Sequence, residues 1–217
     1  MKKYKLVIFD FDYTLADASD GIYGSMEYAF KNLNLSVPSK NEVLQYVGLS
    51  LNDMFKKLTK IDDPILLNNF LKNFRKKANE IMTKNTVILK ETKPTLINIK
   101  GNNILSAIVS TKYRFRILEA LKINNLDSYF NLIIGGEDVN NLKPHPEGIL
   151  KVIENLNINK ENCLYVGDST VDSEAAENAK VDFIGVLTGK TTSSQLNKFK
   201  NISIIKNLSE LKNYIIY

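Results

Sequence analysis

Six short apolar runs constrain this chain more than any other feature of its sequence. Continuous apolar runs of three to six residues suit strands that are buried on both faces, as in a parallel sheet. Amphipathic segments at 113–121, 146–156, 171–179 and 208–216 accompany the later runs and predict helices. This alternation predicts an α/β fold, with a Rossmann-like parallel sheet, right-handed crossovers and helices on both faces. The predicted strands are 6–9, 104–109, 132–134, 163–166, 183–186 and 202–205.

The segment from about residue 19 to residue 84 differs, because it contains no convincing strand. Ser39-Lys40-Asn41-Glu42 has the form of a capping box, and Ser50 is a candidate helix cap. Asp63-Pro64 predicts a helix start, and apolar residues then follow one helical face as far as Ile81. We therefore predict a core domain of residues 1–17 and 86–217, interrupted by an inserted helical domain of residues 18–85.

Composition excludes several classes of protein. The 217 residues are 44% apolar and carry a formal charge of +5, which is enough for a sizeable core and a mild attraction for anions. The lysines are scattered, so nucleic acid is not an expected partner. The single cysteine, Cys163, lies in an apolar run, which indicates a buried structural thiol. The run at 6–9 is too short for a signal peptide and no stretch is long enough to span a membrane, so we expect a cytoplasmic protein.

The first chemical motif is Asp10-Phe11-Asp12-Tyr13-Thr14, directly after the first predicted strand. Residues i and i+2 of an extended chain face the same way, roughly 6–7 Å apart, so Asp10 and Asp12 are expected to converge at the carboxyl end of the strand. Open α/β sheets bind ligands at that edge. Two close carboxylates favour a hard cation such as Mg²⁺, or a proton on one of them. A loop pair or a helix cap is the alternative.

The second motif, Gly167-Asp168-Ser169-Thr170-Val171-Asp172, also follows an apolar run. Asp168 is expected at the same edge of the sheet, and Asp172 lies one helical turn further on, where it can orient neighbouring groups. The alternative is that Asp168 or Ser169 only caps the next helix.

Two further motifs supply groups that bind anions. Ser110-Thr111-Lys112 follows a predicted strand, and a hydroxyl with backbone N–H groups at a helix N-terminus makes an anion site, with a simple helix cap as the alternative. Lys143 lies in a turn that two prolines make rigid, where it can neutralise phosphoryl charge, although most loop lysines are only solvated. His145, the single histidine, is interpreted as a loop residue. The four motifs together suit phosphoryl transfer, in which positioning and charge neutralisation carry the catalysis.

The order Asp-x-Asp-x-Thr, Ser, Lys, Gly-Asp-x-x-x-Asp resembles the haloacid dehalogenase-like (HAD) hydrolase superfamily over the whole chain. DFDYTLAD, IVSTK, LKPHPEGI and VGDSTVDSEAAENA are most similar to its phosphoglycolate phosphatase branch. The helical insert resembles the mobile cap of that family, which implies a cap that closes over the site and excludes water. Tyr13 stands where many members have glycine, and Lys180 stands where Ala-Gly often follows the helix.

The resemblance implies a Mg²⁺-dependent phosphatase acting on a small phosphorylated metabolite through an aspartyl-phosphate intermediate. Asp10 is the expected nucleophile and Asp12 the general acid and base. The side chains of Asp10 and Asp168 and the backbone carbonyl of Asp12 are the expected ligands of Mg²⁺. The expected phosphate-binding residues are Ser110, Thr111 and Lys143, with Asp172 and Thr14 supporting them from behind.

Other functions stay open. The same chemistry serves a sugar-phosphate mutase of β-phosphoglucomutase type, an inorganic pyrophosphatase or a nucleotidase, and a catalytically idle binding protein is a further alternative. Dehalogenation is disfavoured, because Asp12 and a metal site serve phosphoryl chemistry. A monomer or a weak homodimer is expected, and the sequence names no substrate.

Overall fold

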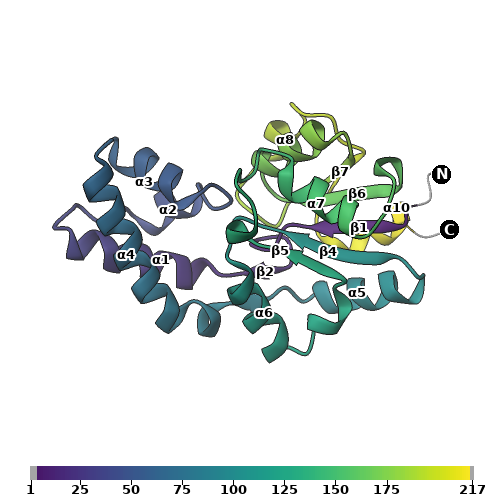
Figure 1. Ribbon diagram of the computed structural model, residues 1–217, viewed down its shortest axis with the longest axis horizontal. Coiled ribbons are helices and arrows are strands. Elements are labelled where there is room, and N and C mark those ends of the chain that lie inside the picture. The colour runs from purple at the N-terminus through teal and green to yellow at the C-terminus, as the bar shows by residue number, and fades with distance from the viewer. Residues whose placement is uncertain (1–3, 216–217) are drawn as a thin grey trace. The chain divides into compact units, whose positions relative to one another are not determined.

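The computed structural model describes residues 4–215 of the 217-residue chain. The chain divides into two compact units (Figure 1). One unit combines the segment up to Asp17 with the segment from Ile88 onward, and the other is Ala18–Val87. The boundaries at 17/18 and 87/88 fall in the two segments where the chain enters and leaves the predicted helical insert.

A parallel sheet organises the larger unit. Its strand order is β5-β4-β1-β6-β7-β8, so the N-terminal strand lies in the middle, flanked by strands far away in the sequence. All five neighbouring pairs are parallel. The carboxyl ends of all six strands therefore lie at the same edge of the sheet. The strands are β1 (Leu6–Phe9), β4 (Leu105–Val109), β5 (Leu132–Ile134), β6 (Cys163–Gly167), β7 (Asp182–Val186) and β8 (Ser203–Ile205).

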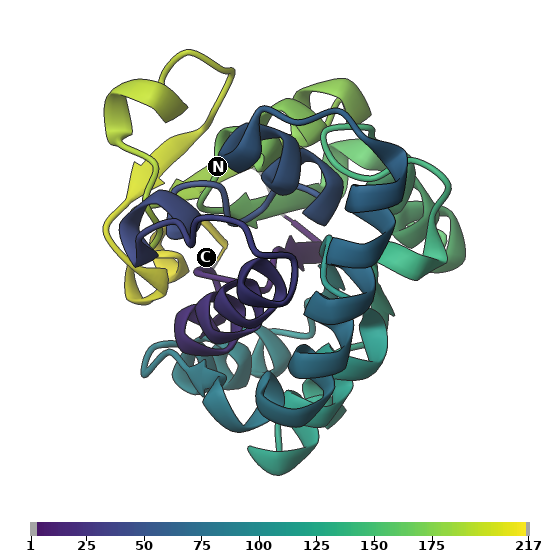
Figure 2. The same ribbon diagram turned by 90° about the vertical axis from the view of Figure 1, so that its left-hand side faces the viewer.

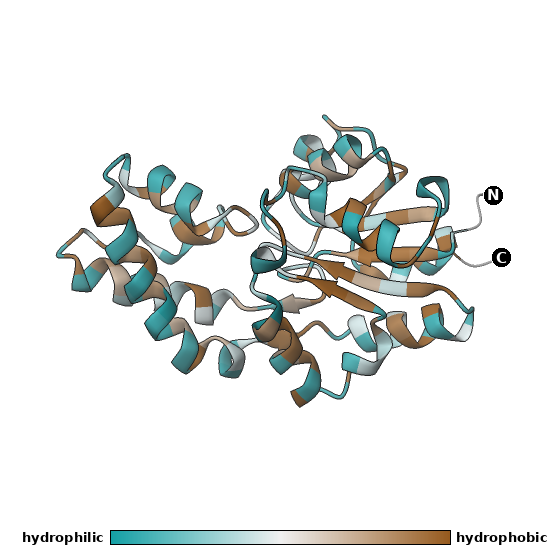
Figure 3. Cartoon of the chain, in the orientation of Figure 1, coloured by the Kyte–Doolittle hydropathy of each residue, from teal (hydrophilic) through white to brown (hydrophobic). Residues whose placement is uncertain are grey.

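Helices cover both faces of this sheet, and the alternation of side chains along the strands explains why both faces are apolar. Val7 and Phe9 pack into a core with helices α5, α6 and α10, whereas Leu6 and Ile8 pack into a second core with α7, α8 and α9. Figure 3 shows apolar strands beside helices with mixed faces. The helices are α5 (Thr92–Gly101), α6 (Arg114–Ile123), α7 (Glu147–Asn155), α8 (Thr170–Ala179), α9 (Ser193–Leu196) and α10 (Lys212–Ile215).

The unit Ala18–Val87 is helical, and its longest helices, α1 and α4, pack against each other (Figure 2). Its core is rich in aromatic rings: Phe30, Phe55 and Phe70 are in mutual contact, with ring centroids 4.8–6.3 Å apart. Ser39 and Glu42 form the predicted capping box, and Asp63 caps the helix that begins at Pro64. The helices are α1 (Ser19–Asn32), α2 (Lys40–Leu44), α3 (Leu51–Thr59) and α4 (Pro64–Ile81).

The prediction of an α/β fold with a Rossmann-like parallel sheet and a helical insert is confirmed, and every predicted strand is present within one residue at each end. Helix α5 was not predicted, because buried Thr92 and Thr95 and exposed Ile97 break its apolar stripe. The single helix predicted over 208–216 is wrong: a 3₁₀ turn at Leu208–Glu210 precedes the short α10, and residue 216 lies outside the described residues. Two short strands, β2 (Ala16–Asp17) and β3 (Val87–Ile88), also form a small sheet that was not predicted.

Candidate active site

Three of the predicted site residues follow three adjacent strands of the sheet. Asp10 follows β1, Ser110 follows β4 and Asp168 follows β6. The Asp10 N–H donates to the Val166 carbonyl (2.9 Å), which continues the ladder one residue beyond the end of β1. All three side chains are buried. The carboxyl edge of the sheet therefore gathers groups that lie up to 158 residues apart in the chain.

Lys143 is the centre of the polar network at this edge. Its Nζ lies 2.8 Å from Asp10 Oδ1 and 2.5 Å from Asp172 Oδ1, and donates to the Tyr165 hydroxyl at 3.1 Å. The Lys143 side chain is only 4% exposed. Its three ammonium protons therefore each have an acceptor, as a buried charge requires. The alternative of a solvated loop lysine is wrong, because the loop before α7 directs the side chain inward.

Asp172 orients this network without offering a vacant oxygen. Its Oδ1 accepts from Lys143 and from the Tyr165 hydroxyl (3.1 Å). Its Oδ2 accepts from the Ser169 N–H (3.0 Å) and the Ser169 hydroxyl (2.6 Å), which closes a capping box at the start of α8. The capping alternative thus holds for Ser169, and Asp172 links that cap to Lys143.

Asp168 is enclosed by two segments of the chain. The Thr14 hydroxyl donates to Asp168 Oδ1 at 3.3 Å. On its other side Gly189 approaches so closely that an added Cβ would lie 1.8 Å from Asp168 Oδ2. The Thr188 hydroxyl donates to the Tyr13 carbonyl, which ties this loop to the first motif. Only glycine fits at position 189 while Asp168 keeps this position.

Asp12 has a different partner from Asp10. Its Oδ2 lies 3.0 Å from the Nζ of Lys112, and both side chains are largely buried, at 12% and 7% exposed. Its Oδ1 is buried with no hydrogen-bond partner among the described residues. One oxygen of Asp12 is thus held by a cation, and the other is unpaired.

Burial and charge shift the pKa values of the groups around Lys143. Burial raises the pKa of Asp10 to about 6, although the Lys143 ammonium opposes the shift. Burial also raises the pKa of Asp168 well above its usual range, and the charges of Asp172 and Asp10 add to this effect. Burial lowers the pKa of Lys143, but the carboxylates of Asp10 and Asp172 outweigh that effect and raise it well above the usual value. Lys143 is therefore a permanent cation. Its one positive charge is not enough to neutralise the carboxyl groups around it.

These carboxyl groups fit a metal ion. Asp10, Asp168 and Asp172 each offer an oxygen within 4.8 Å of the others. Oxygen donors of this kind suit a hard divalent cation. Because both oxygens of Asp172 already accept two hydrogen bonds each, Asp10 and Asp168 are the better ligands. Burial raises the pKa values of Asp10 and Asp168, and a bound cation would favour the charged form of both carboxyl groups.

One geometric expectation is wrong. Ser110 and Thr111 do not lie at the N-terminus of a helix, because α6 begins at Arg114 with Tyr113 as its cap residue. They form a turn instead, in which the Lys112 N–H faces the Ser110 hydroxyl at 3.4 Å. His145 is an exposed loop residue, as expected, and its Nδ1 accepts from the Glu147 N–H at 3.2 Å. Cys163 is a buried thiol, as expected, and its S–H donates to the Asn159 carbonyl at 3.3 Å.

Sequence reasoning missed three residues of this sheet edge, Lys112, Tyr165 and Gly189, and the contacts of Glu147 beside it. Lys112 belongs to the Ser110 motif, and its charge is the signal in the sequence that could have indicated its role. Glu147 stands beside the Lys143 turn, where its carboxylate accepts from the N–H groups of Asn140 and Asn141, each at 2.9 Å. Tyr165 and Gly189 carry no signal, since a tyrosine within an apolar run and a loop glycine are both ordinary.

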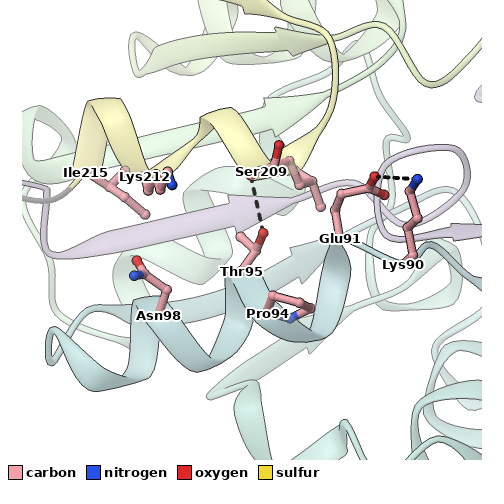
Figure 4. Close-up of a pocket in the computed structure, with 9 residues that line it drawn as sticks. Lys90, Glu91, Pro94, Thr95, Asn98, Ser209, Lys212 and Ile215 are labelled. Atoms are coloured by element: carbon pink, nitrogen blue, oxygen red, sulfur yellow. Dashed lines mark hydrogen bonds and ion pairs between the residues drawn. The ribbon is translucent and has the colours of Figure 1, made fainter.

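A separate cavity of about 480 Å³ lies between α5 and the C-terminal segment (Figure 4). The Thr95 hydroxyl donates to the Leu208 carbonyl across it (3.2 Å), and Lys90 pairs with Glu91 at one end. None of its lining residues belongs to the four motifs. The cavity is therefore not the predicted site. Within residues 4–215, no helix is both long and apolar enough to cross a membrane.

Known proteins similar to this chain place it in a family. Residues 7–186 match the family model of the haloacid dehalogenase-like hydrolases. Pyrophosphatase PpaX of Oceanobacillus iheyensis is 28% identical over 95% of this chain and 94% of its own length. Phosphoglycolate phosphatase of Aquifex aeolicus is 31% identical over 81% of each chain.

The fold has close counterparts among solved structures. The crystal structure of a haloacid dehalogenase-like hydrolase from Bacteroides fragilis superposes with a TM-score of 0.94 at 40% identity, over 96% of this chain and 100% of that one. The predictions of a HAD-like fold and of a hydrolase of the phosphatase type are confirmed by these matches. The chain belongs to the haloacid dehalogenase-like hydrolase family.

Proposed function

We propose that this protein is a Mg²⁺-dependent phosphatase that hydrolyses a small phosphate monoester through an aspartyl-phosphate on Asp10, in the manner of a phosphoglycolate phosphatase. One observation carries the proposal: the buried Asp10 carboxylate lies 2.8 Å from the ammonium of Lys143, at the sheet edge that also holds Asp168. A carboxylate is a competent nucleophile when its electrophile is clamped and its charge is neutralised.

The residues divide the reaction between them. In the first step a carboxylate oxygen of Asp10 forms a bond to phosphorus while the bond from phosphorus to the ester oxygen breaks. Asp12 gives its proton to the departing oxygen, and then takes a proton from the water that attacks the phosphorus of the aspartyl-phosphate. The bond from phosphorus to Asp10 breaks in this second step, and orthophosphate leaves. Ser110, the Thr111 N–H and Lys143 hold the oxygens of the transferring group.

Mg²⁺ is the proposed cation. The side chains of Asp10 and Asp168 and the backbone carbonyl of Asp12 would hold it, with Asp172 and Thr14 fixing the groups around them. When bound, Mg²⁺ neutralises charge on the phosphoryl oxygens. The acidic donors support a hard cation, and manganese is the natural comparison in a metal panel.

The test replaces the nucleophile. Asp10→Asn keeps the shape of the side chain but removes the attacking carboxylate, so hydrolysis of p-nitrophenyl phosphate is expected to vanish while circular dichroism stays unchanged. Glu174→Gln, an exposed neutralisation on α8, is the matched control and should keep full activity. Undiminished hydrolysis by Asp10→Asn would refute the covalent role of Asp10.

Pyrophosphate hydrolysis is the second candidate, because relatives named PpaX are similar to this chain over nearly its whole length. Hydrolysis of pyrophosphate and phosphoglycolate, compared at equal concentration, decides between them. Sugar-phosphate mutase, nucleotidase and idle binding functions are separated by isomerisation assays and a wider substrate panel. Four further expectations stay predictions: the domain boundaries at 17/18 and 85/86, the role of the helical unit as a cap, the cytoplasmic location, and the monomer or weak homodimer.

A further inference from the structure

Lys112 is a cation in the active site to which the proposed chemistry has given no task. Its Nζ lies 3.0 Å from Asp12 Oδ2, and its side chain is only 7% exposed. Lysine is rarely buried without a specific partner or purpose, because its ammonium is strongly hydrated. A buried lysine beside the acid and base of the reaction therefore requires an explanation.

The backbone and the ammonium of Lys112 are both held in place. Its carbonyl accepts from the Gly136 N–H (3.0 Å), and its N–H faces the Ser110 hydroxyl (3.4 Å). Its Nζ lies 5.9 Å from the ring centroid of Phe11, within the range of a cation–π contact. The ammonium is thus positioned before a substrate binds, which lowers the entropic cost of using it.

The two active-site lysines serve different ends of the reacting bond. Lys143 contacts the nucleophile Asp10, so it lies on the side of the transferred phosphoryl group. Lys112 contacts Asp12, which serves the departing oxygen, so it lies on the side of the leaving group. Asp12 Oδ1 is buried and unpaired, which makes it the oxygen that meets the leaving group while Oδ2 stays with Lys112.

We propose that Lys112 determines specificity by binding a negative charge on the leaving group, close to the oxygen that departs. The substrate class this selects is a phosphate ester or anhydride whose leaving group carries a carboxylate or a second phosphate one or two bonds from that oxygen. The inference rests on the proposed function and extends it, because it assigns the leaving-group end of the site. A neutral leaving group makes no such contact with Lys112.

The experiment compares substrates that differ only in this charge. Phosphoglycolate and 2-hydroxyethyl phosphate have leaving groups of similar size, one anionic and one neutral. A charge-assisted hydrogen bond corresponds to a factor of about 10 to 100, so the wild-type kcat/KM should favour phosphoglycolate by that factor. In Lys112→Met and Lys112→Gln the preference should fall to about 1–3-fold, because kcat/KM should fall further for phosphoglycolate than for the neutral 2-hydroxyethyl phosphate. Lys90→Met, which removes an exposed lysine outside the motifs, should keep the wild-type preference.

Three results would overturn the inference. Wild-type enzyme with equal kcat/KM for the two substrates contradicts it without any variant, so the test does not depend on the folding of a mutant. An equal fall in kcat/KM for both substrates in Lys112→Met shows that Lys112 only positions Asp12. A wild type that fails to hydrolyse even p-nitrophenyl phosphate refutes the proposed function itself, and the inference with it. The first two results leave the proposed function intact.

Discussion

Replacing Asp172 by asparagine tests whether this buried carboxylate holds the active-site network together. The variant keeps the shape of the side chain, and its one carbonyl oxygen can still accept from Lys143 and Tyr165. The bond from Tyr165 becomes a neutral one, and the bond from the Lys143 ammonium loses its negatively charged acceptor, a loss of about 1 kcal/mol apiece. The new amide NH₂ replaces Oδ2, so it faces the Ser169 N–H and leaves that donor unpaired, at a cost of about 1–3 kcal/mol.

Together these changes lower the free energy of unfolding by about 3 kcal/mol or more. Removing the charge of Asp172 also relieves its repulsion of Asp10 and Asp168, which offsets part of this loss. Urea unfolding at pH 7 with chelator measures the loss without a contribution from metal binding. Glu174→Gln on the same helix should change stability by no more than about 0.5 kcal/mol, because that carboxylate is exposed. A loss below about 1 kcal/mol in Asp172→Asn would refute the claim that Asp172 joins the cap of α8 to Lys143.

Three further perturbations test separate features. Lys180→Gly should raise the free energy of unfolding by about 1 kcal/mol, because exposed Lys180 ends α8 with φ 59°, a backbone conformation that costs L residues; Glu177→Gly within the same helix should lower it instead, and urea unfolding of both decides. Glu147→Gln should be less stable than wild type at pH 7, because hydrogen bonds from the Asn140 N–H and other donors lower the folded pKa of Glu147 to about 2. The difference in stability should shrink as the pH falls below 4.5 toward 2. Thermal melts at several pH values test this, and a constant difference would contradict it. Chelation should weaken the binding of orthophosphate at least about tenfold in a binding titration, and equal affinity with and without Mg²⁺ would argue against a shared site.

Most of the sheet and of the site edge followed from the sequence for a physical reason. A strand buried on both faces of a parallel sheet has no solvent-exposed face, so its sequence is a continuous apolar run whose ends can be identified. The residue after each run is then placed at the carboxyl edge by the parallel topology alone. The positions of Asp10, Ser110 and Asp168 at this edge are predictable on this basis.

Pairings among side chains were not predictable in the same way. Asp10 and Asp12 pair with different lysines, and the two-residue alternation of an extended chain does not indicate these partners. The chain turns within this motif, where Tyr13 adopts φ 61°. That left-handed conformation gives a physical reason for the glycine that many family members carry at this position. The sequence shows a tyrosine there, so its pattern carries no sign of the turn.

Charge balance connects the metal to the phosphoryl group. Three buried carboxyl groups, those of Asp10, Asp168 and Asp172, are accompanied by one buried ammonium, that of Lys143, while the Lys112 ammonium pairs with Asp12. Stability gives no reason for such an arrangement, since buried charges without full compensation are costly. A divalent cation alone corrects the excess of negative charge, whereas a phosphoryl dianion alone increases it. The two ligands together add no net charge, so each should bind more tightly in the presence of the other. Burial raises the pKa values of Asp10 and Asp168, and the neighbouring carboxylates add to this effect. The acidic excess is therefore the reason to expect phosphate binding to depend on the cation.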